Sequence, residues 1–283
     1  MPREMSEEFI QSRQNPRVKM LASLREKSAR RKLGLFAVEG LRELSRCVEL
    51  RGVEEIYFCP ELFKSPEHSD FISALRNKKS ISLCRLSESA FEKVSNRDGS
   101  DGLIGISRQW ECGLADLPLP SGKPSTILVA DAIEKPGNLG AILRSADSSG
   151  ADAVILTNPV CDIFNPSVVR ASQGALFSIP VAISTPEETA EWLSEKGIES
   201  IGAHLGAKDF IWNADFTKSS AIVVGCESSG LGGDWSSRLG RIVKIPMSGV
   251  SDSMNVGIAA AIFLYEAMRQ KRAFTESSAQ NLR

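Results

Sequence analysis

The sequence has no apolar run long enough to cross a membrane and no pair of cysteines at Cys-x-x-Cys spacing. A helix that spans a bilayer needs about 18 or more consecutive apolar residues. The acidic, polar start of the chain also lacks the basic and apolar regions of a secretory signal. Six cysteines, far apart in a chain of 283 residues, indicate reduced thiols in a cytosolic compartment rather than a disulfide scaffold. We therefore expect a cytoplasmic protein that has no membrane partner.

Histidine is also scarce, because the sequence contains only His68 and His204. Neither has a second ligand nearby at zinc spacing, so we expect no protein metal site. A Ser–His–Asp hydrolase would need one of these residues and a G-x-S-x-G elbow, and the elbow is absent. The sequence also lacks the glycine fingerprint of a dinucleotide site and the lysine of a phosphate-binding loop.

Charge is unevenly distributed along a chain whose net charge is only −1. Between residues 13 and 32 the basic residues outnumber the acidic ones by eight to one; they are Arg13, Arg17, Lys19, Arg25, Lys27, Arg30, Arg31 and Lys32, against Glu26. Such a cluster suits RNA phosphates, whose neutralisation releases counterions and makes binding depend on salt. A solvated helix face explains the same pattern, so both interpretations stay open.

Composition divides the sequence into two halves. Residues 109–125 hold three prolines and two glycines without sustained periodicity, which is typical of an interdomain linker. Residues 1–108 alternate short helical and extended patterns, which predicts a small N-terminal α/β domain. Residues 126–272 alternate apolar strands with helices, which predicts a mostly parallel sheet. Residues 273–283 are polar, and we expect them to be disordered.

The patterns also predict individual elements. In the first half we expect a basic helix at 16–30, strands at 35–38, 55–59, 81–85 and 103–107, and helices at 41–50, 67–77 and 88–94. In the second half we expect strands at 127–131, 153–157, 177–183, 200–203, 221–225 and 242–246, with helices at 138–148, 166–173, 186–196 and 251–271. The last helix is apolar or alanine at nearly every position from Met254 to Met268, so it is buried in its domain or packed on a second subunit.

Three polar segments follow strands of the predicted sheet, at the edge where open α/β sheets bind ligands. In the first, a Pro-Gly turn after Asp131 leads to Asn138, the expected N-cap of a helix that carries Arg144. Asn138 and Arg144 are placed to reach one ligand. An arginine paired with a carboxylate at the sheet edge explains Arg144 as well, so this segment alone decides nothing.

The second segment begins at Gly225, where the lack of a side chain lets a ligand approach the backbone closely. Glu227 follows, either as part of a binding site or as a structural cap for an adjacent loop. The third segment covers residues 245–255 and leads into the last helix, which Ser251 or Asp252 would cap in the ordinary way. Capping leaves Asn255 unexplained, because we expect it inside that apolar helix.

Together the three segments resemble the SpoU (or TrmH) family of RNA ribose methyltransferases in the SPOUT superfamily. The family motifs N-x-G-x-x-x-R, G-x-E-x-x-G-L and I-P-M-x-G-x-x-x-S-L-N correspond in order and spacing to residues 138–144, 225–231 and 245–255. Met254 stands where leucine is usual, and Gly257 where the family often has serine. Residues 165–175 are similar to the family between its first two motifs. Residues 36–40, after a basic helix, resemble the start of its substrate-binding domain, which is similar to kink-turn-binding ribosomal proteins.

This resemblance implies an S-adenosylmethionine-dependent RNA 2′-O-ribose methyltransferase. The implied fold is an α/β, SPOUT-like C-terminal parallel-sheet domain with a deep trefoil knot, together with a small N-terminal α/β RNA-binding domain. The implied partners are structured RNA, ribosomal RNA rather than transfer RNA, and a second copy of the chain bound through the C-terminal domain. By resemblance, the cofactor lies against the backbone of Gly225, Ile245 and Met254, and the reacting ribose is surrounded by Asn138, Arg144, Glu227, Ser253 and Asn255.

The family's usual proposal makes Arg144 the base that deprotonates the ribose hydroxyl. A guanidinium is protonated near neutral pH and is therefore a poor proton acceptor. We expect Arg144 instead to position an RNA phosphate and to stabilise developing alkoxide charge. The main alternative is a non-catalytic RNA-binding or ribosome-assembly protein on the same fold. A nucleotide-binding Rossmann enzyme is a more distant one, because the glycine fingerprint is missing.

Overall fold

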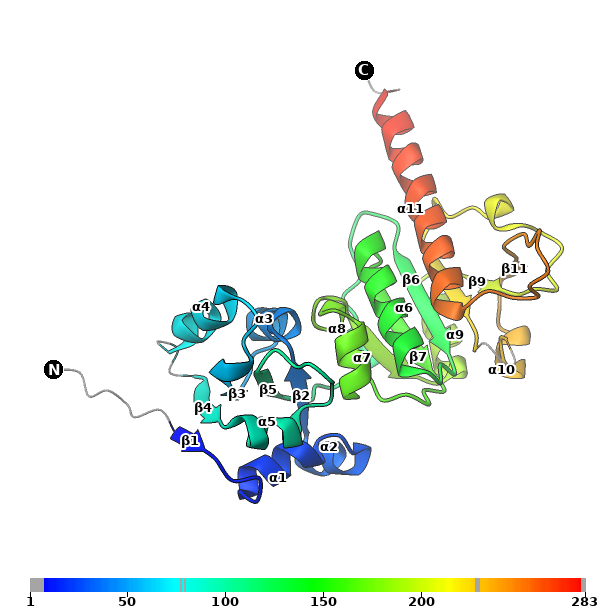
Figure 1. The fold of residues 1–283 in the computed structure, drawn as a ribbon. Helices are drawn as coiled ribbons and strands as arrows, with labels where there is room; N and C mark the ends of the chain where they lie inside the picture. Colours follow the sequence, from blue (N-terminus) through cyan, green and yellow to red (C-terminus); the bar gives the residue numbers. More distant parts are fainter. Residues whose placement is uncertain (1–7, 77, 79, 227–229, 281–283) are drawn as a thin grey trace. The chain divides into compact units, whose positions relative to one another are not determined.

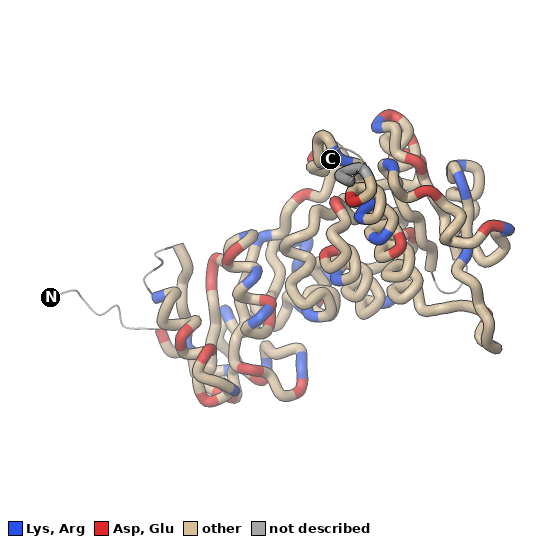
Figure 2. Tube along the Cα trace, turned by 90° about the horizontal axis from the view of Figure 1, so that it is seen from above, with Lys and Arg blue, Asp and Glu red and all other residues tan. Residues whose placement is uncertain are grey.

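The computed structural model describes residues 8–76, 78, 80–226 and 230–280 (Figure 1). The chain forms two compact units. The first comprises Met1–Trp110 together with Asp162–Phe177, and the second comprises Glu111–Cys161 together with Ser178–Arg283. Both units carry lysine and arginine as well as aspartate and glutamate (Figure 2), and their totals, 34 basic and 35 acidic residues, nearly cancel.

The first unit is built on a mixed sheet with the strand order β1-β4-β3-β5-β2. Its strands are β1 (Glu8–Ile10), β2 (Leu35–Glu39), β3 (Glu55–Phe58), β4 (Ser82–Leu86) and β5 (Leu103–Arg108). Strand β5 pairs antiparallel with β2 and β3, whereas the β1–β4 and β3–β4 pairs are parallel. The helices are α1 (Pro16–Ser23), α2 (Lys27–Leu33), α3 (Leu41–Leu50), α4 (Pro66–Leu75), α5 (Glu88–Val94) and α7 (Pro166–Ala171). The predicted α/β character of this half is confirmed.

The second unit is built on a sheet in which all the described strand pairs are parallel, with the order β11-β9-β10-β6-β7-β8. Its strands are β6 (Thr126–Asp131), β7 (Ala153–Thr157), β8 (Val181–Ser184), β9 (Glu199–Ala203), β10 (Ser220–Val224) and β11 (Arg241–Val243). This confirms the prediction of a parallel sheet. The near-continuous apolar strands are buried as expected: every residue of β7 and β10 is buried.

Helices cover both faces of the parallel sheet. On one face α6 (Pro136–Ser149) lies beside α11 (Val256–Gln280) (Figure 1). On the other face Leu193 of α9 (Pro186–Glu195) and Trp235 of α10 (Gly233–Ser236) pack against Ile127 and Val129 of β6. Helix α11 buries Ala260, Phe263, Leu264 and Ala267 and leaves Ile258 and Tyr265 exposed. Some apolar side chains of α11 are therefore buried within the second unit, and others face solvent.

Several elements differ from the sequence-based expectations. The single helix expected at 16–30 is two helices, because the Arg25 guanidinium bonds to Asn96 Oδ1 and to the carbonyls of Lys93 and Ser95, which holds the chain in a turn. Strand β1 and helix α10 were not expected. The extended segment predicted at 177–183 begins with α8 (Ala175–Ser178) before β8. Helix α11 continues to Gln280, into the part of the chain for which we expected disorder.

The connection between β7 and β8 packs into the first unit. The sequence predicted residues 162–177 within the C-terminal domain, but their side chains join a hydrophobic cluster built on β2. The ring of Phe164 lies 4.9 Å from that of Phe36 and 4.7 Å from that of Trp110, and Phe177 stacks on Phe36. One crossover of the parallel sheet is thus part of the hydrophobic core of the other unit.

A buried ion pair joins this crossover to helix α2. Arg30, predicted as part of an RNA-binding cluster, is 1% exposed. Its Nε and Nη2 donate to Asp162 Oδ2 at 2.9 and 2.6 Å, and its Nη1 donates to the carbonyls of Leu24 and Arg25. Burial therefore excludes Arg30 from the solvent-facing cluster, and its role is structural.

Replacing Arg30 with alanine is expected to lower the free energy of unfolding by about 3–5 kcal/mol, because it leaves the Asp162 carboxylate without its partner in a largely buried position. Urea denaturation of the two proteins measures the difference. Arg31→Ala is the control, since Arg31 is exposed and its removal should cost less than about 0.5 kcal/mol. A loss below about 1 kcal/mol for Arg30→Ala would contradict the structural role.

Candidate active site

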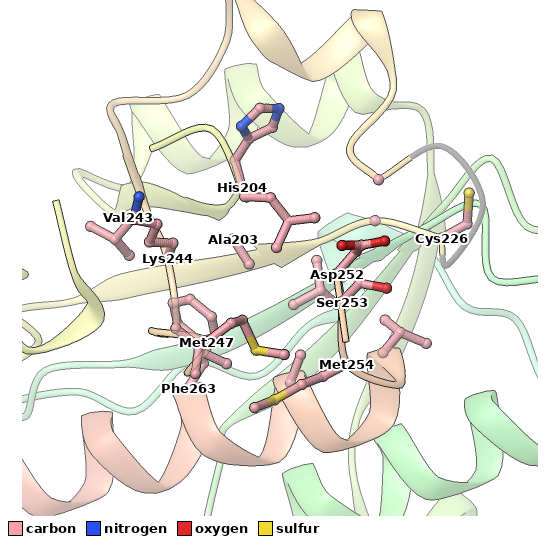
Figure 3. A pocket seen from close by; sticks show the side chains of 17 residues that line it. Ala203, His204, Cys226, Val243, Lys244, Met247, Asp252, Ser253, Met254 and Phe263 are labelled. Atoms are coloured by element: carbon pink, nitrogen blue, oxygen red, sulfur yellow. The ribbon is translucent and has the colours of Figure 1, made fainter. Parts of the chain in front are cut away.

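A cavity of about 450 Å³ lies at the carboxyl ends of β9, β10 and β11 (Figure 3). The strand ends contribute residues 203–205, 224–226 and 243–245, and the segment before α11 contributes residues 252–254. This is the edge at which parallel sheets bind ligands. The second and third sequence motifs therefore border one cavity, as the sequence predicted from the order of strands and loops.

The walls of the cavity are mainly apolar. Met247, Met254 and Phe263 lie along the side of the cavity formed by α11, and the oxygens of Asp252 and Ser253 point toward Cys226 (Figure 3). Among the described lining residues, His204 and Lys244 add two further polar side chains. An apolar pocket with a few directed polar groups is the usual form of a small-molecule site.

Gly225 is held so tightly that no side chain fits there. A Cβ built on it would lie 2.0 Å from the carbonyl oxygen of Gly230 and 2.4 Å from the amide nitrogen of Leu231. Gly230 itself has φ +67°, and its N–H donates to the carbonyl of Cys226 at 3.0 Å. The backbone of the second motif thus folds back on itself beside the cavity. Glu227, the expected acid of this motif, lies outside the described residues.

The first motif lies beside this cavity on α6. That helix begins at Pro136 and its N-cap is Lys135, so Asn138 is in the first helical turn. The prediction that Asn138 is the N-cap was wrong, because proline at the first helical position sets the start two residues earlier. Asn138 borders a small depression that shares Cys226 and Val256 with the larger cavity.

Asn255 is a helix cap. Helix α11 begins at Val256, and Asn255 Oδ1 accepts hydrogen bonds from the N–H groups of Gly257 (3.0 Å) and Ile258 (3.3 Å). The sequence predicted a start near residue 251 with Ser251 or Asp252 as the cap, and that prediction was wrong. Asn255 is therefore not a polar residue inside the helix, and it makes the usual N-cap hydrogen bonds.

One hydrogen bond joins the first and third motifs. Asn255 Nδ2 donates to Asn138 Oδ1 at 2.9 Å, across 117 positions of sequence. Close packing of α6 on α11 supports this contact, because a Cβ on Gly257 would lie 3.2 Å from the Cβ of Ala141. A bulkier residue than glycine at position 257 would press on the helix that carries Asn138.

Arg144 is exposed on α6 and does not line the cavity. Among the described residues, none forms a hydrogen bond or an ion pair with its guanidinium. The alternative of an arginine paired with a carboxylate at the sheet edge therefore has no support in this part of the structure. Asp131, the acid at the end of β6, instead accepts hydrogen bonds from Thr157 Oγ1 and Asn158 Nδ2.

Sequence reasoning missed the lining residues at the end of β9 and just after β9 and β11. Ala203, His204 and Leu205 border the cavity, and so does Lys244. They belong to none of the three motifs, and β9 adjoins the motif-bearing strand β10 only through the strand order of the folded sheet. No local pattern in the sequence marks them.

The chain matches known proteins along most of its length. A family model described as the SpoU rRNA Methylase family matches residues 125–265, and one described as an MRM3-like substrate binding domain matches residues 15–105. The 23S rRNA (guanosine(2553)-2′-O)-methyltransferase of Bacillus subtilis (strain 168) is 28% identical over 256 residues, which are 90% of this chain and 97% of that protein.

Solved structures agree with these matches. A crystal structure of an RNA 2′-O ribose methyltransferase is 35% identical, with a TM-score of 0.80 over 93% of this chain and 99% of the other. The AdoMet-bound rRNA methyltransferase from Sinorhizobium meliloti is 28% identical, with a TM-score of 0.82 over 93% of this chain and 97% of the other. The similarity in sequence and in structure thus covers both units.

Proposed function

This chain belongs to the SpoU rRNA methylase family, and from that premise we propose that it transfers a methyl group from S-adenosylmethionine to a ribose 2′-hydroxyl of ribosomal RNA. The observation that supports this most is the convergence of its three motif segments. Two of them border one cavity, and the Asn138–Asn255 hydrogen bond ties the first motif to the third beside it.

The cavity fits the cofactor in size and chemistry. Its volume of about 450 Å³ lies in the range of about 300–1,000 Å³ that is usual for small-molecule sites. Apolar walls suit an adenine ring, and the backbone at Gly225, Ile245 and Met254 offers amide and carbonyl groups for its polar edges. Bound there, S-adenosylmethionine supplies a methyl group already activated by the sulfonium charge.

The residues of the chain must then orient the ribose oxygen and help it lose its proton. We assign this work to side chains of the three motifs, namely Asn138, Arg144, Glu227, Ser253 and Asn255. Arg144 binds an RNA phosphate and stabilises charge that develops on the 2′-oxygen, and the proton leaves to phosphate or solvent. The exposed position of Arg144 supports contact with a large ligand.

RNA capture is assigned to the first unit, whose residues 15–105 match a substrate binding domain. The basic cluster on its first two helices is smaller than the sequence suggested. Arg30 is buried, and Arg17 pairs with Glu8 and Glu55. Lys27, Arg31 and Lys32 on α2 remain exposed, and none of them forms an ion pair with a described residue.

Replacing Lys27, Arg31 and Lys32 together with glutamine is expected to flatten the salt dependence of RNA affinity. Each lost phosphate contact lowers the slope of log Kd against log salt by about 0.7–0.9, so three contacts lower it by about 2–3. Filter binding of in vitro transcribed 23S rRNA at several salt concentrations measures this slope. The control replaces the exposed Lys78, Lys196 and Lys218 with glutamine. Equal slopes for wild type and the α2 variant would mean that these cations are merely solvated.

Three further features complete the proposal. The chain forms a homodimer through the face of α11 that carries Ile258 (56% exposed) and Tyr265 (46% exposed), since exposed apolar residues at helical spacing are typical of an interface.

The loops of the second and third motifs form a deep trefoil knot, as the family resemblance implies. The protein acts in the cytoplasm, where the thiols of six cysteines that lie far apart in the sequence stay reduced. Among the described residues, no helix is long and apolar enough to span a membrane.

The proposed function is tested by mapping 2′-O-methylated nucleotides in RNA from cells with and without the protein. We expect one or a few ribosomal RNA sites to lose their methyl group when the protein is removed. Calorimetry with S-adenosylmethionine is the second measurement. If the protein does not bind the cofactor and no site changes, it is a non-catalytic RNA-binding protein on the same fold.

A further inference from the structure

The hydrogen bonds of Asn255 determine which end of its amide faces Asn138. The oxygen and nitrogen of an asparagine amide are distinguished by their hydrogen-bond partners. Asn255 Oδ1 accepts from two backbone N–H groups, those of Gly257 and Ile258, and only an oxygen can do so. Its Nδ2 is therefore the atom that faces Asn138, and it is a donor.

This arrangement determines the orientation of the second amide as well. Because a donor from Asn255 meets it at 2.9 Å, the facing atom of Asn138 must be its oxygen, Oδ1. A flipped Asn138 would place two N–H donors against each other. The N–H groups of Asn138 Nδ2 are consequently directed away from Asn255. Asn138 borders the depression next to the cavity, together with Lys135 and Cys226.

We propose that Asn255 is a positioning residue: by capping α11 it fixes the amide of Asn138, so that Asn138 presents hydrogen-bond donors to an acceptor oxygen of the RNA. This inference rests on the proposed methyl transfer. It states that the Asn138 side chain offers hydrogen-bond donors, and not an acceptor, to the RNA substrate. The acceptor is the ribose 2′-oxygen, whose negative charge grows as its proton leaves. A donor aimed at developing charge is worth about 10²–10³ in rate. Asn138 thus stabilises the oxygen and does not remove its proton.

Helix capping and amide orientation can be separated by substitution. Asparagine, aspartate and serine cap helices about equally well. In Asn255→Asp the cap oxygen is retained, but the second oxygen of the new carboxylate accepts from Asn138, which flips that amide and turns its oxygen toward the RNA. In Asn255→Ser the cap is also retained, but the one hydrogen bond that orients the Asn138 amide among the described residues is lost.

The expected order of kcat is therefore wild type, then Asn255→Ser, then Asn255→Asp. We expect a loss of about tenfold or less for serine and about 10²-fold for aspartate, with 23S rRNA transcript and labelled S-adenosylmethionine as substrates. The melting temperature should stay within about 2 °C of wild type and the Kd for the cofactor should be unchanged in both variants. A purely structural cap predicts the reverse order, with aspartate at least as active as serine.

Two controls make the result specific. Asn165 caps α7 through a hydrogen bond from the N–H of Ser167 (2.8 Å), so Asn165→Asp makes the same chemical change at a cap in the first unit and should leave kcat unchanged. In an Asn138→Ala background, Asn255→Asp should lower kcat by less than about twofold, because no amide remains to be flipped. A further loss of tenfold or more in that background would overturn the proposal. Failure of the wild type to methylate rRNA would instead overturn the proposed function.

Discussion

Replacing Arg144 with lysine is expected to lower kcat almost as far as replacing it with alanine, by about 10²–10³-fold in both cases. A lysine keeps the charge but loses the planar fork that binds a phosphate through two parallel hydrogen bonds. If Arg144 acted only through its charge, Arg144→Lys would retain most of the turnover. The measurement is the multiple-turnover rate of 23S rRNA methylation at saturating substrate with each variant.

The exposed position of Arg144 makes this experiment interpretable. Its guanidinium has no ion pair or hydrogen bond with any residue that the structure describes, so its loss should change the free energy of unfolding by less than about 0.5 kcal/mol. Affinity for S-adenosylmethionine should also be unchanged, because Arg144 does not line the cavity. Arg31→Lys is the matched control. At that exposed position only charge is needed, and full activity is expected.

The arrangement of strands was predictable because strands buried on both faces leave a clear signal. The runs at 127–131, 153–157 and 221–225 are almost entirely apolar, and each coincides with a strand of the parallel sheet. Helix ends were less predictable where two signals competed. Ser251 and Asp252 are both good capping residues, yet the helix begins after Asn255, which bonds to the helix and to Asn138 at once.

Tertiary contacts account for the features that the sequence did not indicate. The break between α1 and α2 depends on the bonds of Arg25 to residues about 70 positions away. Residues 162–177 belong to the first unit because of two kinds of contact. The rings of Phe164 and Phe177 pack on Phe36. Asp162 forms an ion pair with Arg30. An arginine at position 30 has the same sequence context whether it faces solvent or a buried carboxylate. Local patterns cannot separate these cases.

The residues of the candidate site also fall into those that the sequence indicates and those that only the folded structure brings together. Spacing within each motif is local, so residues 138–144, 225–231 and 245–255 could be recognised from sequence. The side chains after β9 line the cavity only because β9 lies between β10 and β11, which is a property of the folded sheet. Gly225 belongs to both groups. The sequence predicts a close approach to its backbone, and the structure shows that the backbone of Gly230 and Leu231 makes this approach.

Gly225→Ala is expected to weaken binding of S-adenosylmethionine by at least about 100-fold, or about 2.7 kcal/mol. The added Cβ would lie 2.0 Å from the oxygen and 2.2 Å from the carbonyl carbon of Gly230. Both are backbone atoms, so no change of side-chain rotamer relieves the clash. The strand end or the segment around Gly230 must move, and both border the cavity. Isothermal calorimetry measures the affinity.

Gly137→Ala is the matched control, because a Cβ at Gly137 meets no atom within 4 Å and the residue lies in the first turn of α6. That variant should bind the cofactor as the wild type does. The same clash in Gly225→Ala should also cost about 1–3 kcal/mol of stability, as overpacking usually does. The substitution reduces the magnitude of the free energy of cofactor binding by more than it lowers the free energy of unfolding only if the bound cofactor requires the close contact between Gly225 and Gly230. A stability loss with affinity within threefold of wild type would show that this backbone contact serves the fold and not the ligand.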